Sequence, residues 1–496
     1  MTSTQATSSS ARAAAGAGLL FVSQIVGNAL YFLIQRSIIS ELPKESFGAL
    51  SFVQQTSSLL LVVLVDAGIN NIAIREIIQH PQRERDIVSA SLWLRLFASI
   101  VSAGIISVFF LCTDASLVSI GAMCIASVSV SARMTFFRSS MELPLRSKMN
   151  YGLMSALFVL DTLLYATALW SYEGRLEPLT ILSLQFVTSL PGFIILISRV
   201  RGIQYLFPLP SFTHIRTLVL ETRSVATQLF MQNVHAGIDI FILRFTSTLR
   251  ELAVFGAVAN ISVIILTLYN ALSTAAYPLL AERDTSSDPS ILHARILRSL
   301  SLVSFAAMFV ASCLSTLAPM IIILFTKNVY RDHLPEFQYQ FWCTVAIVIA
   351  QFTVVVNTAI RNHRAAVYCG AALVVGSLLF DFALIPGMGT RGMLIAKALS
   401  NLLCAGVGLF FLGRVVGPNI IGRYLLRVVS VGTLLVATSM NILGFFSMPV
   451  ALALTILMSL ILGAVSGMVT KADAELFTEL VRRFIPRRNP TSIAQE

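Results

Sequence analysis

Two stretches of the chain carry the same pattern and decide the fold. Residues 16–49 are GAGLLFVSQIVGNALYFLIQRSIISELPKESFGA, and residues 223–257 are RSVATQLFMQNVHAGIDIFILRFTSTLRELAVFGA. At a constant offset of 208 positions the two stretches share identical residues: Gln24 and Gln232, Arg36 and Arg244, Phe47-Gly48-Ala49 and Phe255-Gly256-Ala257. Each contains a mostly apolar segment of the length that crosses a bilayer, about 20 residues.

The composition extends this membrane interpretation to the whole chain. Of 496 residues, 56% are hydrophobic and only 12% are charged, against about 25% charged in soluble proteins. We expect about fourteen transmembrane helices, at residues 16–39, 48–68, 87–111, 115–135, 152–171, 178–199, 223–244, 252–277, 298–325, 339–360, 364–384, 391–413, 424–444 and 447–469.

The repeat predicts how these helices are grouped. Its two copies lie six helices apart, and because six is even they run in the same direction. The expected fold is therefore all-α, with two six-helix lobes related by an axis along the membrane normal and two extra C-terminal helices. The predicted parts are a disordered cytoplasmic N-terminus 1–15, an N-lobe 16–200, a cytoplasmic linker 201–222, a C-lobe 223–413, helices thirteen and fourteen in 414–470, and a basic cytoplasmic tail 471–496.

The positive charge predicts the orientation. The chain has 35 Lys and Arg against 24 Asp and Glu, a net charge of +11. With both termini in the cytoplasm, 25 Lys and Arg, among them Arg138 and Arg146, fall on inner segments and 7 on outer segments, as the positive-inside rule requires. The excess charge is thus an orientation signal for a multi-pass protein of the cytoplasmic membrane, and we expect no nucleic-acid partner.

The connections argue against an enzyme. All are too short to hold a soluble catalytic domain, and the sequence has no nucleotide-binding loop and no metalloprotease or hydrolase motif. The six cysteines and six histidines are not spaced as metal ligands. We expect a transporter with no cofactor and no bound metal.

Acidic residues inside the predicted spans are candidates for ion coupling, because a charge at the helix centre costs about 2.5–3.5 kcal/mol. Asp161 is the deepest, and it either pairs with Arg, Ser or Asn of a neighbouring helix or couples protons or Na⁺. Asp239 lies on a polar face of its helix. Asp66 either couples ions, or only caps its helix or pairs with Arg75. Asp381, before Pro386, is expected at a helix end.

Two polar stripes occupy repeat-equivalent helices. Their members are spaced as one face of a helix and are Gln24, Asn28, Tyr31 and Gln35 in the first span, and Gln228, Gln232, His235 and Asp239 in the seventh. A polar face in lipid must turn towards protein or water. The stripes therefore either face each other across a central cavity or form hydrogen bonds between helices within each lobe.

Four cations inside the spans are not explained by orientation: Arg36, Arg95, Arg244 and Lys397. Each either reaches the membrane interface with its long side chain or enters the cavity. In a cavity, Arg would bind phosphate oxygens in pairs and Lys would act as a mobile point charge. Such cations suit an anionic ligand that carries phosphate better than a cationic one.

The sequence resembles that of the polysaccharide-export flippases, which belong to the multidrug/oligosaccharidyl-lipid/polysaccharide superfamily. The similar segments are Leu42–Phe52, Asp66–Asn71, Gly237–Leu243 and Tyr277–Glu282. The resemblance implies a two-lobed, alternating-access transporter that flips a polyprenyl-(di)phosphate-linked oligosaccharide for O-antigen, exopolysaccharide or capsule synthesis.

Under this hypothesis the candidate residues fall into two groups. The substrate-binding group is Arg36, Arg95, Arg244, Lys397, Gln24, Asn28, Gln232 and His235, and the group that couples protons or Na⁺ is Asp161, Asp239 and Asp66. A polysaccharide polymerase and glycosyltransferases are the expected protein partners. The alternatives are a multidrug/cation antiporter of the same superfamily and a membrane-embedded glycan polymerase or ligase.

Overall fold

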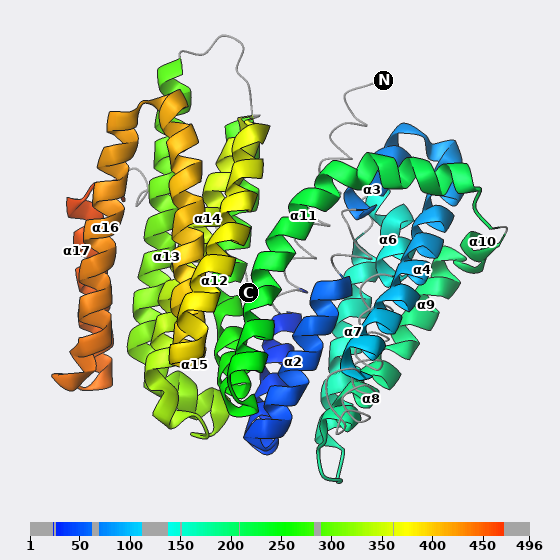
Figure 1. Ribbon diagram of the computed structural model, residues 1–496, viewed down its shortest axis with the longest axis horizontal. Coiled ribbons are helices and arrows are strands. Elements are labelled where there is room, and N and C mark those ends of the chain that lie inside the picture. Colours follow the sequence, from blue (N-terminus) through cyan, green and yellow to red (C-terminus); the bar gives the residue numbers. More distant parts are fainter. Residues whose placement is uncertain are drawn as a thin grey trace, which may run out of the picture. The chain divides into compact units, whose positions relative to one another are not determined.

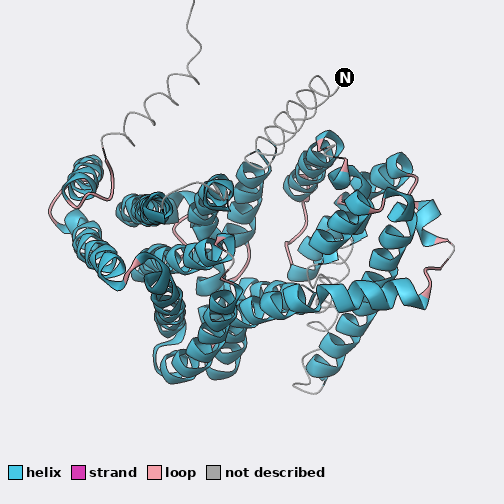
Figure 2. Cartoon of the chain, turned by 90° about the horizontal axis from the view of Figure 1, so that it is seen from above, coloured by secondary structure: helices cyan, strands magenta, loops and turns pink. Residues whose placement is uncertain are grey.

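The computed structural model describes residues 23, 26–61, 69–111, 137–148, 151–207, 209–281, 289–360 and 362–470. Throughout these residues every regular element is a helix (Figure 2). The prediction of an all-α membrane protein is confirmed, since eight of the described helical stretches are long and apolar enough to cross a membrane.

The helices follow one another with short connections (Figure 1). In chain order they are a helix over residues 26–41, α2 (Lys44–Leu61), α3 (Ile69–Gln79), η2 (Pro81–Arg83), α4 (Glu84–Leu111), α6 (Arg138–Ser147), α7 (Gly152–Trp170), α8 (Pro178–Thr188), α9 (Leu190–Val200), α10 (Ile203–Leu206), α11 (Phe212–Thr246), α12 (Leu249–Ala281), α13 (Pro289–Thr326), η4 (Arg331–His333), α14 (Leu334–Ala359), α15 (His363–Val416), α16 (Pro418–Asn441), η5 (Ile442–Gly444) and α17 (Met448–Val465). Every predicted span coincides with one of these helices wholly or in part, except 115–135, which lies outside the described residues.

Two predicted helix boundaries differ from the structure for local reasons. The sixth span is divided between α8 and α9 at Ser189, because Pro191 has no N–H to donate and its ring crowds the preceding turn. Spans eleven and twelve form the single element α15, which contains a break at Gly389 with φ +55° and ψ −132°. Glycine allows this left-handed φ without strain, so the expected outer loop is a tight turn.

Segments expected as inner connections are also helical. Helix α11 starts at Phe212, about three turns before the predicted span, and Ser211 caps it by accepting a hydrogen bond from the His214 N–H. Helix α6 is buried from Arg138 to Pro144, although the sequence places it in an inner loop. The start of α11 and the whole of α6 are therefore ordered helices and not loops, and α6 is part of the buried core.

The chain divides into two compact units whose boundaries cut through α12, α13, α14 and α15. The first unit is Met1–Ile261, Met320–Glu336 and Gly370–Ser400, and the second is Ser262–Pro319, Phe337–Cys369 and Asn401–Glu496. An apolar core of the first unit brings together α3, α4, α6, α7, α9 and α10 through buried side chains: Ala73, Ile77, Val88, Leu92, Met141, Leu143, Leu157, Leu196 and Tyr205.

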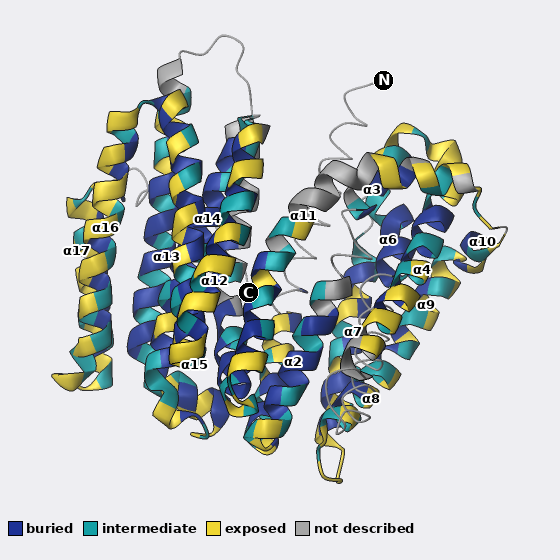
Figure 3. Ribbon diagram, in the orientation of Figure 1, coloured by how far each residue is buried: buried dark blue, intermediate teal, exposed yellow. Residues whose placement is uncertain are grey.

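In the second unit, α17 packs on α13 through small residues. The buried positions of α17 recur every four residues and are Ala451, Thr455, Ser459 and Gly463; exposed positions lie between them (Figure 3). Thr455 and Thr316 share a hydrogen bond of 3.0 Å, and Ser459 and Ser312 one of 3.3 Å. Small side chains let the helices approach closely, as is usual where lipid provides no hydrophobic driving force.

The repeated Phe-Gly-Ala motif lies where α2 and α12 meet, inside the first unit. A Cβ atom on Gly48 would collide with the backbone carbonyl oxygen of Leu249, and one on Gly256 would collide with the Ser51 hydroxyl. The two glycines of the repeat therefore permit the close crossing of α2 and α12. This gives a packing reason for the sequence identity seen at the offset of 208 positions.

We predict that Gly48→Ala lowers stability, because overpacking against a backbone atom costs about 1–3 kcal/mol. Gly104→Ala is the matched control, since Gly104 is also helical but has no atom within 4 Å of the added Cβ, and alanine favours a helix. The measurement is the apparent midpoint of thermal denaturation of the purified protein in detergent. Equal midpoints for the two variants would contradict the proposed crossing.

Candidate functional site

A polar cavity of about 430 Å³ lies within the first unit. It is bounded by the helix over residues 26–41 and by α2, α8, α11 and α12. Its lining residues are Tyr31, Phe47, Ser51, Gln54, Gln55, Leu59, Leu182, Gln185, Asn233, Ala236, Gly237, Ile240, Gly256 and Asn260. The repeat motif thus contributes Phe47 and Gly256 to the wall of the cavity.

The lining is polar but uncharged in the described part of the chain. Five of its side chains are amides, from Gln54, Gln55, Gln185, Asn233 and Asn260. Asn260 donates one hydrogen bond, 2.9 Å long, to the carbonyl oxygen of Gly256. An amide both donates and accepts hydrogen bonds, so the lining can bind a ligand that presents hydroxyl or amide groups without requiring it to carry a charge.

Helix α11 presents different residues to the cavity and to α15. Its cavity face contains Asn233 and Gly237, whereas the predicted stripe residues His235 and Asp239 contact α15. The His235 Nδ1 shares a hydrogen bond with the Ser377 hydroxyl, and Asp239 accepts one of 2.7 Å from the Lys397 ammonium. For these two residues the structure has the hydrogen bonds between helices that the alternative interpretation of the stripes predicted.

The ion pair of Lys397 and Asp239 is buried. The side chains are 14% and 2% exposed, and Asp239 also accepts a hydrogen bond of 2.9 Å from the N–H of Ile240. The Lys397 ammonium lies 5.4 Å from the centre of the Phe255 ring. The structure therefore brings a predicted phosphate-binding cation and a predicted coupling acid together, and neither lines the cavity.

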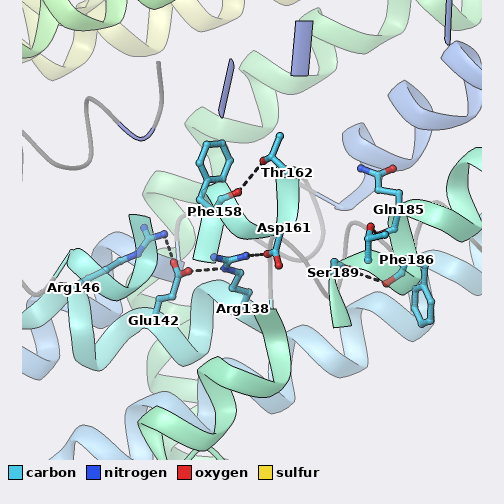
Figure 4. Close-up of polar contacts among 10 residues, drawn as sticks. Arg138, Glu142, Arg146, Phe158, Asp161, Thr162, Gln185, Phe186 and Ser189 are labelled. Carbon is cyan, nitrogen blue, oxygen red and sulfur yellow. Dashed lines mark hydrogen bonds and ion pairs between the residues drawn. The ribbon is translucent and has the colours of Figure 1, made fainter. Parts of the chain in front are cut away.

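Asp161 belongs to a chain of alternating charges (Figure 4). It forms an ion pair with Arg138, whose Nε also donates to Glu142 at 2.8 Å, and Glu142 accepts a second bond of 2.9 Å from Arg146. The side-chain exposure rises from 3% at Asp161 to 32% at Arg146. Two cations and two anions balance in this chain, and a Cβ on Gly192 of α9 would collide with the Asp161 carboxylate. Of the two interpretations left open for Asp161, the structure shows the pairing.

Arg95 lies in a second buried network. It is fully buried in α4 and donates hydrogen bonds to the Ser140 hydroxyl at 2.8 Å and to the side-chain oxygen of Asn70 at 3.0 Å. Asn70 also accepts a 3.0 Å bond from Ser139. These bonds connect α3, α4 and α6, and Arg95 is not among the residues that line the cavity.

The remaining candidate site residues are not brought together at one site by the described part of the structure. Arg36 and Arg244 are half-buried and make no hydrogen bond or ion pair with the described part of the chain, and the Arg36 Nε is buried. Asn28 is exposed, and Tyr31 of the same stripe lines the cavity. Gln24 and Asp66 lie outside the described residues, as does the side chain of Gln232. The proposed roles of all these residues stay predictions.

Most residues of the cavity lining are uncharged and belong to neither predicted stripe, so the sequence did not predict them. Gln54, Gln55, Gln185 and Asn260 are amides inside predicted apolar spans, and that property could have identified them. The sequence also placed Arg138 in an inner loop as a cation, although the residue is only 9% exposed. The spacing of charges along one helix could not show this, since the partner acid comes from another helix.

The architecture is that of a multi-pass membrane protein with a polar cavity among its helices. The chain belongs to the polysaccharide biosynthesis protein family, whose sequence profile matches residues 13–283. No curated protein matches the chain.

Solved structures with the same fold include transporters of the MOP superfamily. A lipid II flippase MurJ in an inward closed conformation is 11% identical in sequence, with a TM-score of 0.69. The match covers 94% of this chain and 100% of that one. An inward-facing multidrug resistance MATE transporter is 15% identical, with a TM-score of 0.62 and coverage of 81% of this chain and 98% of that one. A MOP superfamily transporter from Pyrococcus furiosus is 14% identical, with a TM-score of 0.58 and coverage of 82% and 96%. At these identities the likeness shows the fold.

We predict that Arg138 and Asp161 are strongly coupled in stability. Arg138→Gln leaves the buried Asp161 carboxylate without its cation, and Asp161→Asn leaves Arg138 with Glu142 as its remaining acid. Each single variant therefore unbalances the buried charges, which costs up to about 3–5 kcal/mol. The double variant should cost clearly less than the sum of the two single variants. The measurement is a double-mutant cycle on thermal stability of the purified protein, with Arg146→Gln as a control at the half-exposed end of the chain of charges. Additive losses would contradict the pairing.

Proposed function

We propose that the protein is a flippase that moves a polyprenyl-(di)phosphate-linked oligosaccharide across the cytoplasmic membrane by alternating access, for the synthesis of a surface polysaccharide. The observation that carries the proposal is the uncharged, amide-rich cavity in a member of the polysaccharide biosynthesis family. Sugars present many hydroxyl groups that both donate and accept hydrogen bonds, and amide side chains complement them in both directions.

The position of the cavity supports a transport role. Amides that face hydrocarbon without partners are costly, so a polar cavity among membrane helices is stable only when water or a polar ligand fills it. The glycan would occupy this cavity while the polyprenyl chain stays in the lipid. A ligand of this kind needs no covalent chemistry from the protein, in keeping with a transporter.

We propose that the phosphate end of the substrate binds cations that are not among the described residues of the cavity lining. Arg36 and Arg244 are repeat-equivalent, and neither is engaged with another described side chain. An arginine without a protein partner can give its donors to phosphate oxygens. Lys397 differs, because binding a phosphate would require it to leave Asp239.

A multidrug/cation antiporter is the competing function on the same fold. A site for cationic drugs would favour carboxylates and aromatic rings. The cavity has two aromatic residues, Tyr31 and Phe47, and no carboxylate among its described lining residues. This difference favours the glycan flippase.

We predict that loss of cavity amides reduces glycan export. Gln54→Leu and Gln185→Leu each remove groups that bind the substrate, and an unmade hydrogen bond of about 1–1.5 kcal/mol corresponds to about tenfold weaker binding. The measurement is surface glycan per cell in a deletion strain complemented at equal protein level, together with the lipid-linked glycan retained inside. Gln79→Leu, an exposed position at the end of α3, is the matched control.

The outcomes of this experiment separate the two functions. Reduced surface glycan with retained lipid-linked glycan is expected for the cavity variants and for the deletion strain. Full export in both cavity variants would contradict the proposed site. Normal glycan combined with loss of dye efflux in the deletion strain would instead identify a drug antiporter.

We also predict that both termini lie in the cytoplasm. Alkaline phosphatase is active only outside the cytoplasmic membrane, so a fusion after Gly174, in the predicted outer loop between α7 and α8, should be active. A fusion after Glu496 should be inactive, whereas green fluorescent protein at the same position should fluoresce. The opposite pattern would reverse the orientation derived from the positive charges.

A further inference from the structure

Asp381 is a buried acid that the proposed function has not used. The sequence places it at a helix end, but that expectation is wrong, because α15 continues through it and the residue is only 1% exposed. Its Oδ2 atom is buried and makes no hydrogen bond with the described part of the chain. A buried carboxylate without a partner is among the least favourable groups in a membrane protein.

The surroundings of Asp381 contain one cation and a second acid. Asp381 interacts electrostatically with Asp239 of α11 and with Lys397 of the second half of α15. Its own helix contributes Ser377 one turn earlier, whose hydroxyl is bonded to His235 of α11. Farther along α15, at the Gly389 break, the charged groups are engaged with other partners: Glu251 of α12 accepts a 2.9 Å hydrogen bond from the N–H of Thr390, and Arg391 is paired with Glu336 at 2.7 Å.

The charges of this cluster do not balance if every acid is ionised. Lys397 donates its 2.7 Å hydrogen bond to Asp239, so that pair is neutral as a whole. An ionised Asp381 would add one uncompensated negative charge at a position excluded from water. The free energy of burying an isolated carboxylate is large enough that such groups take up a proton instead.

We infer that Asp381 is a proton-binding site, neutral in this conformation. When Lys397 leaves Asp239 and pairs with Asp381, Asp381 releases its proton to water, and water that enters the cluster in that second conformation solvates the ionised Asp239 carboxylate, so that no acid is left charged and dry. In the opposite step Lys397 returns to Asp239, and Asp381 takes a proton from water. One lysine shared between two acids thus links the position of its ammonium group to one bound proton. The participation of this step in transport rests on the proposed flippase function, whereas the bound proton does not.

The cluster suits a proton better than a metal ion. Na⁺ and divalent cations need several oxygen ligands, and within the described residues no group of three or more His, Cys, Asp or Glu side chains could hold a metal. The Lys397 ammonium already occupies the Asp239 carboxylate. A proton needs only one carboxylate oxygen, and the Oδ2 of Asp381 is buried with no hydrogen bond to the described part of the chain.

Infrared spectroscopy of the purified protein in lipid nanodiscs tests the bound proton directly. At neutral pH the wild type should show the C=O stretching band of a protonated carboxylic acid, and Asp381→Asn should lack it. Asp332→Asn, which changes an exposed acid in η4, should retain the band. Lys397→Met should add a second band, because Asp239 then loses its cation. A spectrum of Asp381→Asn identical to that of the wild type would overturn the inference.

Thermal stability gives a second test that does not depend on the band. Asparagine resembles a neutral carboxylic acid, so Asp381→Asn should denature at a temperature close to that of the wild type. Asp239→Asn removes the ionic partner of Lys397 and should denature at a clearly lower temperature. A variant Asp381→Asn that fails to fold, or that loses as much stability as Asp239→Asn, would overturn the assignment of the proton to Asp381.

Glycan export tests the link to transport. The strain is a deletion strain complemented with the wild type or with Asp381→Asn, and cellular ATP is monitored. A brief protonophore pulse should reduce glycan export by the wild type. Without the protonophore, Asp381→Asn should export at the level of the protonophore-treated wild type. Export by Asp381→Asn that still falls with the protonophore would overturn the coupling role. If the wild type exports no lipid-linked glycan, the proposed function fails, while the infrared band still decides the proton site.

Discussion

The lipid solvent sets the constraint on which this structure depends, because hydrocarbon offers no partner to a polar group. The described backbone satisfies its own donors and acceptors by forming helices, and many hydroxyls bond back to a carbonyl one turn earlier, as Thr316 does to Ser312. Polar side chains that remain must meet one another between helices. The hydroxyl pairs of α13 with α17 and the Arg95 network are such meetings.

The same constraint explains why the buried charges occur in groups. Asp161 is balanced through Arg138 and Glu142, and Asp239 is balanced by Lys397. Charges that satisfy each other contribute to packing and leave little to offer a ligand. The described lining of the cavity, in contrast, has amides and hydroxyls but no charged side chain. Buried charges and the neutral polar groups of the cavity are thus spatially separated in the first unit.

The sequence predicted the helices well because hydrophobic length is a local property. The Phe-Gly-Ala repeat predicted two related lobes, and the structure adds that its glycines lie where α2 and α12 approach closely. The sequence was less successful for the site. Ionisable residues were noticed because a single charge in a span is conspicuous, whereas Gln54, Gln185 and Asn260 carry no charge and have no regular spacing along the chain. Asp381 was placed at a helix end because the continuation of the first half of α15 through Pro386 has no local signal.

The sequence by itself determined that this chain is an all-helical membrane protein and which family it resembles, and its charge distribution predicts the orientation. Each of these follows from composition and local pattern, because the bilayer acts on every segment separately. Only the tertiary structure decided the partner of each polar side chain: Arg138 for Asp161, Lys397 for Asp239, and no described partner for Asp381. A partner is selected by proximity in three dimensions, and residues 138 and 161, or 239 and 397, have no pattern in the chain that relates them.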